Sequence, residues 1–194
     1  MGKSKKNIYQ FTLVLKNVDE KTVGLEDSLY EAGCDDALIN FRNGTVYLDF
    51  DRKGHSLEEA VIDAIKAVES ASIGALVTHV APEDWVTETE VAKRIPCKRQ
   101  TISLWCHEQR RKANPFPKPV MKLANRSPFW KWCEIAEWLY LNNLTDKQTV
   151  ENAKFLENLN AVLDERDPDI KKLRMRLLKE INLTHSKNSN LSSH

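Results

Sequence analysis

WVTETEVAKRIPCKRQTISLW, residues 85–105, is the stretch that decides the fold of the central part of this chain. Thr87 and Glu90 are spaced as a capping box, in which each side chain accepts from the other residue's backbone N–H, so a helix is expected through Arg94. Pro96 ends that helix because proline lacks a backbone N–H. A second helix is expected from about Lys98 to Glu108. The pattern predicts two short helices joined by a tight turn.

The residues that follow extend this unit to about residue 143. Prolines recur through residues 114–119, NPFPKP, and exclude a helix there. Residues 120–123 and 129–130 flank a polar turn at 125–127 and are expected to pair as a small hairpin, the wing. A third helix is expected over 131–142. Its apolar face comprises Trp132, Ile135, Ala136 and Leu139.

Residues 8–82 show the order β-α-β-β-α-β. Apolar residues alternate with polar ones around 9–15, 37–41, 46–50 and 76–80, which is the period of a strand. Asn43-Gly44 is a strong hairpin signal because both residues tolerate positive φ. Helices are expected over 23–32 and, behind a capping box at Ser56, over 57–68. This order resembles the ferredoxin-like split βαβ arrangement, with both helices on one face of the sheet.

The fold class expected is therefore α+β, with an N-terminal ferredoxin-like βαββαβ domain, a central winged helix-turn-helix and C-terminal helices. The expected divisions are a flexible basic tail (1–7), the ferredoxin-like domain (8–82), the winged helix-turn-helix (85–143), a helical extension (145–181) and a disordered Ser/Asn-rich tail (182–194). Pro168 separates two apolar stripes in the extension. The first comprises Phe155, Leu156, Leu159, Val162 and Leu163, and the second comprises Ile170, Leu173, Leu177, Leu178 and Ile181.

Charge is distributed unevenly along the chain, although its formal net charge is only +1. Residues 7–85 carry six basic and fifteen acidic side chains, whereas residues 86–138 carry eleven basic and five acidic ones. The basic part suits contact with phosphates, and the acidic part would be repelled by them. The sequence has no apolar run long enough for a membrane span and no secretory signal, so a cytoplasmic protein without a membrane partner is expected.

Three pieces in fixed order carry a resemblance to a known family: residues 85–105, FPKPV at 116–120 and FWKWCEIAEWL at 129–139. Together they resemble the excisionase/AlpA group of winged helix-turn-helix proteins, which are relatives of the MerR regulators. The chain departs from that pattern at Lys98, where a small helix-capping residue is usual, and at Pro96, where glycine is common. The resemblance implies binding of double-stranded DNA, with Arg126 in the wing entering the minor groove or gripping the backbone.

The second helix of this unit has the polarity that a recognition helix requires. Its inward side is expected to comprise Cys97, Thr101, Ile102 and Trp105, while its start presents cationic and amide side chains. Arginine can bind guanine and glutamine can bind adenine through paired hydrogen bonds. The residues expected to read bases are Lys98, Arg99, Gln100 and Ser103. Those expected to contact the DNA backbone or form the wing are Thr87, Arg110, Arg111, Lys112, Lys118, Lys122, Asn125 and Arg126.

The function expected is that of a sequence-specific transcriptional regulator, not an enzyme, which binds double-stranded DNA as a homodimer. Two alternatives remain open: an antitoxin-type autoregulator whose acidic N-terminal domain binds a protein partner, and an excisionase-like factor that bends DNA. A nuclease using Asp49 and Asp51, with Asp35 and Asp36 nearby, is less favoured than a solvated acidic sheet face. No catalytic residue, metal site or cofactor is expected, because Cys97, Cys106, His107 and Cys133 match no familiar zinc spacing. The five tryptophans are expected mainly in the core rather than stacked on bases.

Overall fold

The computed structural model describes residues 6–82, 84–107, 114–120 and 128–189, and it has a mixed α+β fold. The N-terminal part contains four antiparallel strands in the order β2-β3-β1-β4. The strands are β1 (Asn7–Lys16), β2 (Ala37–Arg42), β3 (Thr45–Gly54) and β4 (Leu76–Ala81). Two helices, α1 (Leu25–Glu31) and α2 (Leu57–Ser70), connect them so that the chain runs β1-α1-β2-β3-α2-β4.

The core of this part lies on one face of the sheet, as the alternation of apolar residues predicts. Leu13 lies opposite Leu48 on β3 and Val80 on β4, and all three side chains are fully buried. Buried residues of α1 and α2 pack into the same core. Asn43 and Gly44, both with positive φ, make the turn from β2 to β3. The opposite face of the sheet carries Asp49 and Asp51 and remains exposed.

The second part of the chain is largely helical. It comprises β5 (Trp85–Val86), α3 (Glu88–Arg94), α4 (Arg99–Cys106), β6 (Trp130–Lys131) and α5 (Trp132–Leu141). The sequence predicts the three helices within about two residues of their observed ends. The pairing of β5 with β6 was not predicted. The expected wing lies mostly outside the described residues, and what is described is one backbone bond, from the N–H of Val120 to the carbonyl of Phe129 at 3.0 Å.

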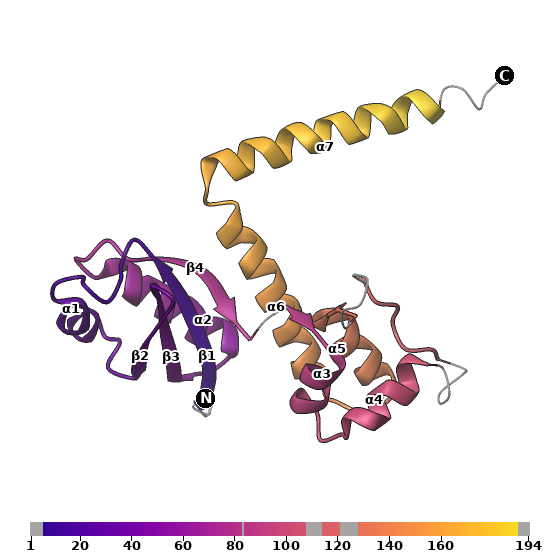
Figure 1. The fold of residues 1–194 in the computed structure, drawn as a ribbon, viewed down its shortest axis with the longest axis horizontal. Coiled ribbons are helices and arrows are strands. Elements are labelled where there is room, and N and C mark those ends of the chain that lie inside the picture. Colours follow the sequence, from indigo (N-terminus) through magenta and orange to yellow (C-terminus); the bar gives the residue numbers. More distant parts are fainter. Residues whose placement is uncertain (1–5, 83, 108–113, 121–127, 190–194) are drawn as a thin grey trace, which may run out of the picture.

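Helix α6 (Lys147–Asp164) joins the two parts. Its first half buries Val150 and Ala153 in the core of the helical part, and its second half buries Leu156 and Leu163 in the core under the sheet. Figure 1 shows α6 running between the two parts, alongside β4 at one end and α5 at the other. The helical extension expected from residue 145 therefore contributes its first helix to both cores.

The residues that α6 buries also differ from those of the predicted apolar stripe. Val162 is 59% exposed, whereas Asn160, which the stripe omitted, is 5% exposed. Helix α7 (Pro168–Ser189) then continues past residue 181 into the segment for which the sequence predicts disorder. The physical reason is that no glycine or proline interrupts the chain after Pro168, which itself suits the first turn of a helix. None of the helices in the described part of the chain combines the length and apolar character that a membrane crossing requires.

Candidate nucleic-acid interface

The candidate interface is built on α3 and α4, which the sequence predicted as a helix–turn–helix pair. The capping box at the start of α3 is confirmed: Thr87 Oγ1 accepts from the Glu90 N–H at 3.3 Å, and Glu90 Oε2 accepts from the Thr87 N–H at 2.6 Å. After α3, the Cys97 N–H donates to the Ile95 carbonyl at 2.7 Å and closes the turn. This turn sets the direction in which α4 begins.

Helix α4 has a buried and an exposed side. Ile102 and Trp105 are 0% and 5% exposed, and they pack in the same core as Val91 of α3. Lys98, Arg99 and Gln100 are exposed at the start of α4, while Ser103 is half-buried. The predicted polarity of the helix is thus present, with its cationic and amide side chains at the N-terminal end of the exposed side.

A carboxylate lies beside this exposed cluster. Glu88 Oε2 is 3.8 Å from Arg99 Nε, and the Arg99 side chain is 67% exposed while that of Glu88 is 17% exposed. An ion pair in which one partner is so exposed contributes little to stability, because solvent screens it and the long side chain must be ordered. Arg99 can therefore leave Glu88 for a stronger partner at small cost.

An aromatic cluster fixes the proline-rich segment next to α4. Phe116 is 7% exposed and lies between Trp105, Trp130 and Trp138, with ring centroids 6.2, 5.7 and 5.0 Å from its own. Two indole N–H groups bind this segment: Trp130 Nε1 donates to the Pro117 carbonyl at 2.8 Å, and Trp138 Nε1 donates to the Asn114 carbonyl at 3.2 Å. The exposed Lys118 therefore projects from an anchored backbone.

The tryptophans mostly belong to the core, as expected. Trp105, Trp130, Trp132 and Trp138 are all at most 9% exposed. Trp85 differs, because it is 38% exposed and Lys131 Nζ lies 5.9 Å from its ring centroid. Base stacking on the four buried rings is therefore excluded in this conformation.

The structure brings together only some of the predicted contact residues. Lys98, Arg99, Gln100 and Ser103 all lie on α4 or at its start. Thr87 is half-buried, and its hydroxyl is used by the cap of α3. The remaining predicted contacts, apart from Lys118, lie outside the described residues; they are Arg110, Arg111, Lys112, Lys122, Asn125 and Arg126.

Two basic residues of the helical part have structural contacts that the charge count did not reveal. The Arg94 guanidinium lies 4.9 Å from the ring centroid of Trp132. Lys131 Nζ donates to Glu157 Oε1 of α6, and this hydrogen bond raises the pKa of Lys131. Not every positive charge in residues 86–138 is therefore available to a phosphate. Neither contact has a local sequence signal, because each joins residues that are far apart in the chain.

Two cysteines of this part, Cys106 and Cys133, lie in surroundings that disfavour the thiolate form. Burial is the largest cause that raises the pKa of Cys106 and Cys133, and together with the nearby carboxylates of Glu88 and Glu157, respectively, it brings each pKa to about 12. Both thiols are therefore protonated at neutral pH. Within the described residues, no group of three potential metal-ligating side chains is found.

The carboxylates considered for phosphoryl chemistry do not converge either. Asp49 accepts hydrogen bonds from Thr12 and Asn40, and Asp51 Oδ1 accepts one from Gln10 Nε2 at 2.9 Å. Asp36 instead forms a two-point ion pair with Arg52, with N–O distances of 2.7 and 3.0 Å. These contacts favour the solvated acidic sheet face over a shared Mg²⁺ site.

In comparisons with protein-family models, with curated proteins and with solved structures, nothing matches this chain.

Proposed function

We propose that residues 85–141 form a winged helix-turn-helix that binds double-stranded DNA, and that the chain is a sequence-specific transcriptional regulator rather than an enzyme. The observation that carries the proposal is the orientation of α4. Its inner side is held by Ile102 and Trp105, so the side chains at 98–100 project outward together. A helix with that polarity can enter the major groove, which is wide enough to admit it.

The four residues expected to read bases, on α4 or at its start, each have a chemical role in this proposal. Arg99 binds the O6 and N7 atoms of a guanine, and Gln100 binds the N6 and N7 atoms of an adenine. Ser103 adds one hydrogen bond to a neighbouring base edge, and Lys98 reaches a base or a phosphate. Glu88, the present partner of Arg99, holds the guanidinium close to the helix until a base replaces it.

The second set of contacts is to phosphate. Lys118 is exposed on the segment that Phe116 anchors next to α4, so its ammonium group can contact the backbone while α4 occupies the groove. The expected phosphate and wing contacts at 110–112 and 122–126 belong to the same proposal. Each neutralised phosphate adds about 0.9 to the slope of log affinity against log salt.

The N-terminal part is proposed to be a ferredoxin-like domain that does not touch DNA. The strand order β2-β3-β1-β4 and the connection order β1-α1-β2-β3-α2-β4 support that arrangement. Its excess of acidic side chains disfavours contact with phosphates, so its role is to bind a protein partner or to add to a dimer contact made elsewhere in the chain.

The experiment that tests the proposal is selection of bound duplexes from a random DNA library by the full chain at about 150 mM salt. We expect a defined sequence to be enriched and to bind more tightly than random duplex. A variant with Lys98, Arg99 and Gln100 all replaced by alanine should lose this preference while keeping its circular dichroism spectrum. Lys66→Ala, at an exposed position on α2, is the control and should bind like the unmodified chain. Failure to enrich any sequence would contradict the proposal.

A further inference from the structure

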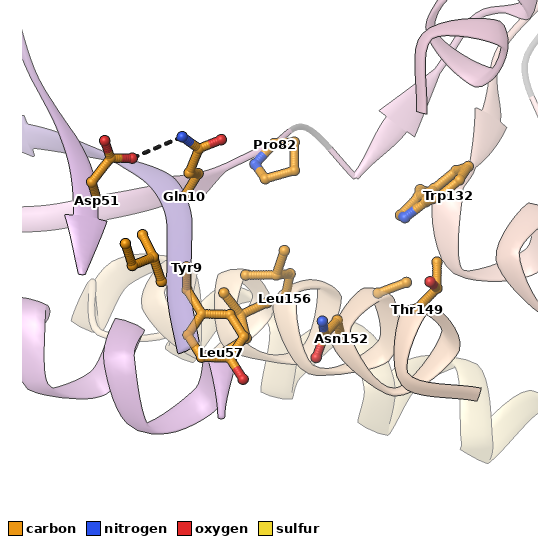
Figure 2. Close-up of a pocket in the computed structure, with 11 residues that line it drawn as sticks. Tyr9, Gln10, Asp51, Leu57, Pro82, Trp132, Thr149, Asn152 and Leu156 are labelled. Atoms are coloured by element: carbon orange, nitrogen blue, oxygen red, sulfur yellow. Dashed lines mark hydrogen bonds between the residues drawn. The ribbon is translucent and has the colours of Figure 1, made fainter. Parts of the chain in front are cut away.

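A pocket of about 630 Å³ lies at the junction of the two parts of the chain (Figure 2). One wall is formed by β1 and β3 and the start of α2, and the other is formed by Trp132 at the start of α5 and by α6. None of the residues proposed to contact DNA lines it. Its volume falls in the range of pockets that bind small organic molecules, roughly 300–1,000 Å³.

The lining of the pocket is apolar in the middle and polar at the two ends. Leu57 and Leu156 are buried and form part of its floor. Figure 2 shows Asp51 and Gln10 at one end and Trp132 at the other, with Asn152 on the α6 side. A ligand that fills this space must therefore be apolar in its body and polar at its ends.

The Trp132 end offers a hydrogen-bond donor. The Trp132 side chain is 9% exposed, and its indole nitrogen lies at the end of the ring that faces the pocket (Figure 2). The indole N–H groups of Trp130 and Trp138 bind backbone carbonyls, whereas among the described residues Trp132 Nε1 makes no hydrogen bond within the chain. Indole N–H groups at largely buried positions usually find an acceptor, so this end suits a ligand oxygen.

The opposite end favours a positive charge. Asp51 is the one formally charged side chain among the described residues that line the pocket, and Gln10 Nε2 binds only its Oδ1 atom. The surrounding segment 7–85 has a large excess of acidic over basic side chains, which raises the local concentration of cations and repels anions. Asp51 can accept hydrogen bonds from an ammonium group through its second oxygen.

From this arrangement we propose that the pocket binds a small organic cation with an aromatic or aliphatic body. The amine pairs with Asp51, the body packs on Leu57 and Leu156, and an oxygen at the far end accepts from Trp132 Nε1. Such a ligand contacts both parts of the chain at once. The proposal does not depend on DNA binding, so a test of ligand binding and a test of DNA binding can succeed or fail separately.

Nuclear magnetic resonance of the ¹⁵N-labelled full chain can test this, with tyramine as the probe because it carries an ammonium group, an aromatic ring and a phenolic oxygen. The indole cross-peak of Trp132 is assigned by its loss in Trp132→Phe. We expect tyramine to shift that cross-peak in a saturable manner. Asp51→Asn should weaken the binding at least about fivefold. Asp49→Asn, which removes a neighbouring charge outside the pocket, should leave the affinity within about twofold.

Two matched compounds separate the contributions that the two ends of tyramine make to its affinity. N-acetyltyramine lacks the positive charge, and phenethylamine lacks the phenolic oxygen, so both should bind more weakly than tyramine. A cross-peak that does not shift in a saturable manner would overturn the proposal. Equal affinities for the unmodified chain and Asp51→Asn, or for tyramine and N-acetyltyramine, would overturn it as well.

Discussion

Glu88 and Arg99 show how a single residue can tune the proposed interface. Glu88 lies in the first turn of α3, where its negative charge interacts favourably with the helix dipole. Its Oε2 atom is 3.8 Å from Arg99 Nε. In a complex with DNA, this carboxylate would lie near the phosphates and compete with the base for Arg99. The acid therefore limits affinity while it keeps the arginine close to α4.

Replacing Glu88 with glutamine is expected to increase the affinity for the selected duplex about threefold, since it removes a competing charge from an exposed pair. The measurement is fluorescence polarisation with labelled duplex at constant salt. Glu26→Gln, on the exposed side of α1, makes the same change of net charge far along the chain and should have a smaller effect. An unchanged or weaker affinity of Glu88→Gln would contradict this role of Glu88.

Among single residues, the sequence predicts the contacts made between positions that are close together in the chain. The Thr87–Glu90 capping box and the Asn43-Gly44 turn follow from backbone requirements within four residues, and both are confirmed. The Glu88–Arg99 pair and the contact of Arg94 with Trp132 could not be predicted in the same way. They depend on how α3 lies against α4 and α5, which no local pattern specifies.

Among the helices and strands, α6 contacts the sheet through the buried polar side chain of Asn160. Asn160 is 5% exposed, its Oδ1 accepts from the Val80 N–H at 2.8 Å, and its Nδ2 donates to the Val80 carbonyl at 3.0 Å. The amide thus satisfies both backbone groups of Val80 on the outer side of the edge strand β4. An edge strand covered in this way cannot pair with another chain there.

Asn160→Leu keeps a similar volume but leaves the Val80 backbone groups without these partners. We expect it to lower the free energy of unfolding by about 2 kcal/mol, within the range for buried unsatisfied polar groups. Urea denaturation followed by circular dichroism gives the value. Asn158→Leu, at an exposed position of α6, should change stability by less than about 0.5 kcal/mol. Equal losses in the two variants would show that Asn160 has no special role.

An ion pair connects the chain just after α6 to the end of α2. Arg166 donates two hydrogen bonds of 2.7 Å to Glu69, which also accepts from the Val77 N–H at 3.1 Å. Burial by itself would raise the pKa of Glu69, but the hydrogen bonds from Arg166 and Val77 outweigh it and lower that pKa. The stabilisation is therefore present above the ordinary carboxyl pKa and is lost as the pH falls through the lower, folded-state value.

Glu69→Gln is expected to lower the free energy of unfolding at pH 7 by about 1 kcal/mol, because this partly exposed pair is screened by solvent. The difference from the unmodified chain should shrink as the pH falls below the folded-state pKa of Glu69, where the carboxyl of the unmodified chain becomes neutral. Urea denaturation at a series of pH values measures it. A difference that stays constant down to the most acidic pH at which the chain folds would contradict the linkage.

The sequence predicts the helices and strands better than it predicts how they pair and pack. Strands with period-two alternation and the capped helices are all found, because each depends on a pattern of several residues. Strands β5 and β6 are two residues long and have no period to detect. In α6, the apolar stripe is visible but its register is not, because buried Asn160 replaces an apolar residue and Val162 is left exposed.

In the whole molecule, α7 is the element that packs on neither core. All its described side chains, residues 168–182, are exposed, and Figure 1 shows the helix extending away from both parts. Most of the stability of a helix in a protein comes from the packing of its apolar face, which α7 lacks within one chain. Leu173 and Leu177 are 46% and 44% exposed and lie on one stripe. The proposed homodimer would cover this stripe with α7 of a second copy and present two recognition helices to paired half-sites.

Light scattering after size exclusion tests the dimer. The unmodified chain should show about twice its mass of 22.3 kDa, and the double variant Leu173→Glu, Leu177→Glu should show the mass of one chain. The double variant Lys172→Glu, Lys179→Glu places the same number of new acids outside that stripe and should remain a dimer. A single-chain mass for the unmodified protein at the micromolar concentrations used for DNA binding would contradict the proposed homodimer.

The proposed recognition of DNA depends most on Arg99, which reads a base from α4. The direct test is to measure the affinities of the unmodified chain and of Arg99→Ala for every single-base-pair variant of the selected duplex, by polarisation at about 150 mM salt. Arg99→Ala should lose about 1–3 kcal/mol and its preference at one G·C pair only, whereas Lys118→Ala should weaken binding to all variants alike. A uniform loss for Arg99→Ala, with every base preference intact, would contradict base reading by Arg99.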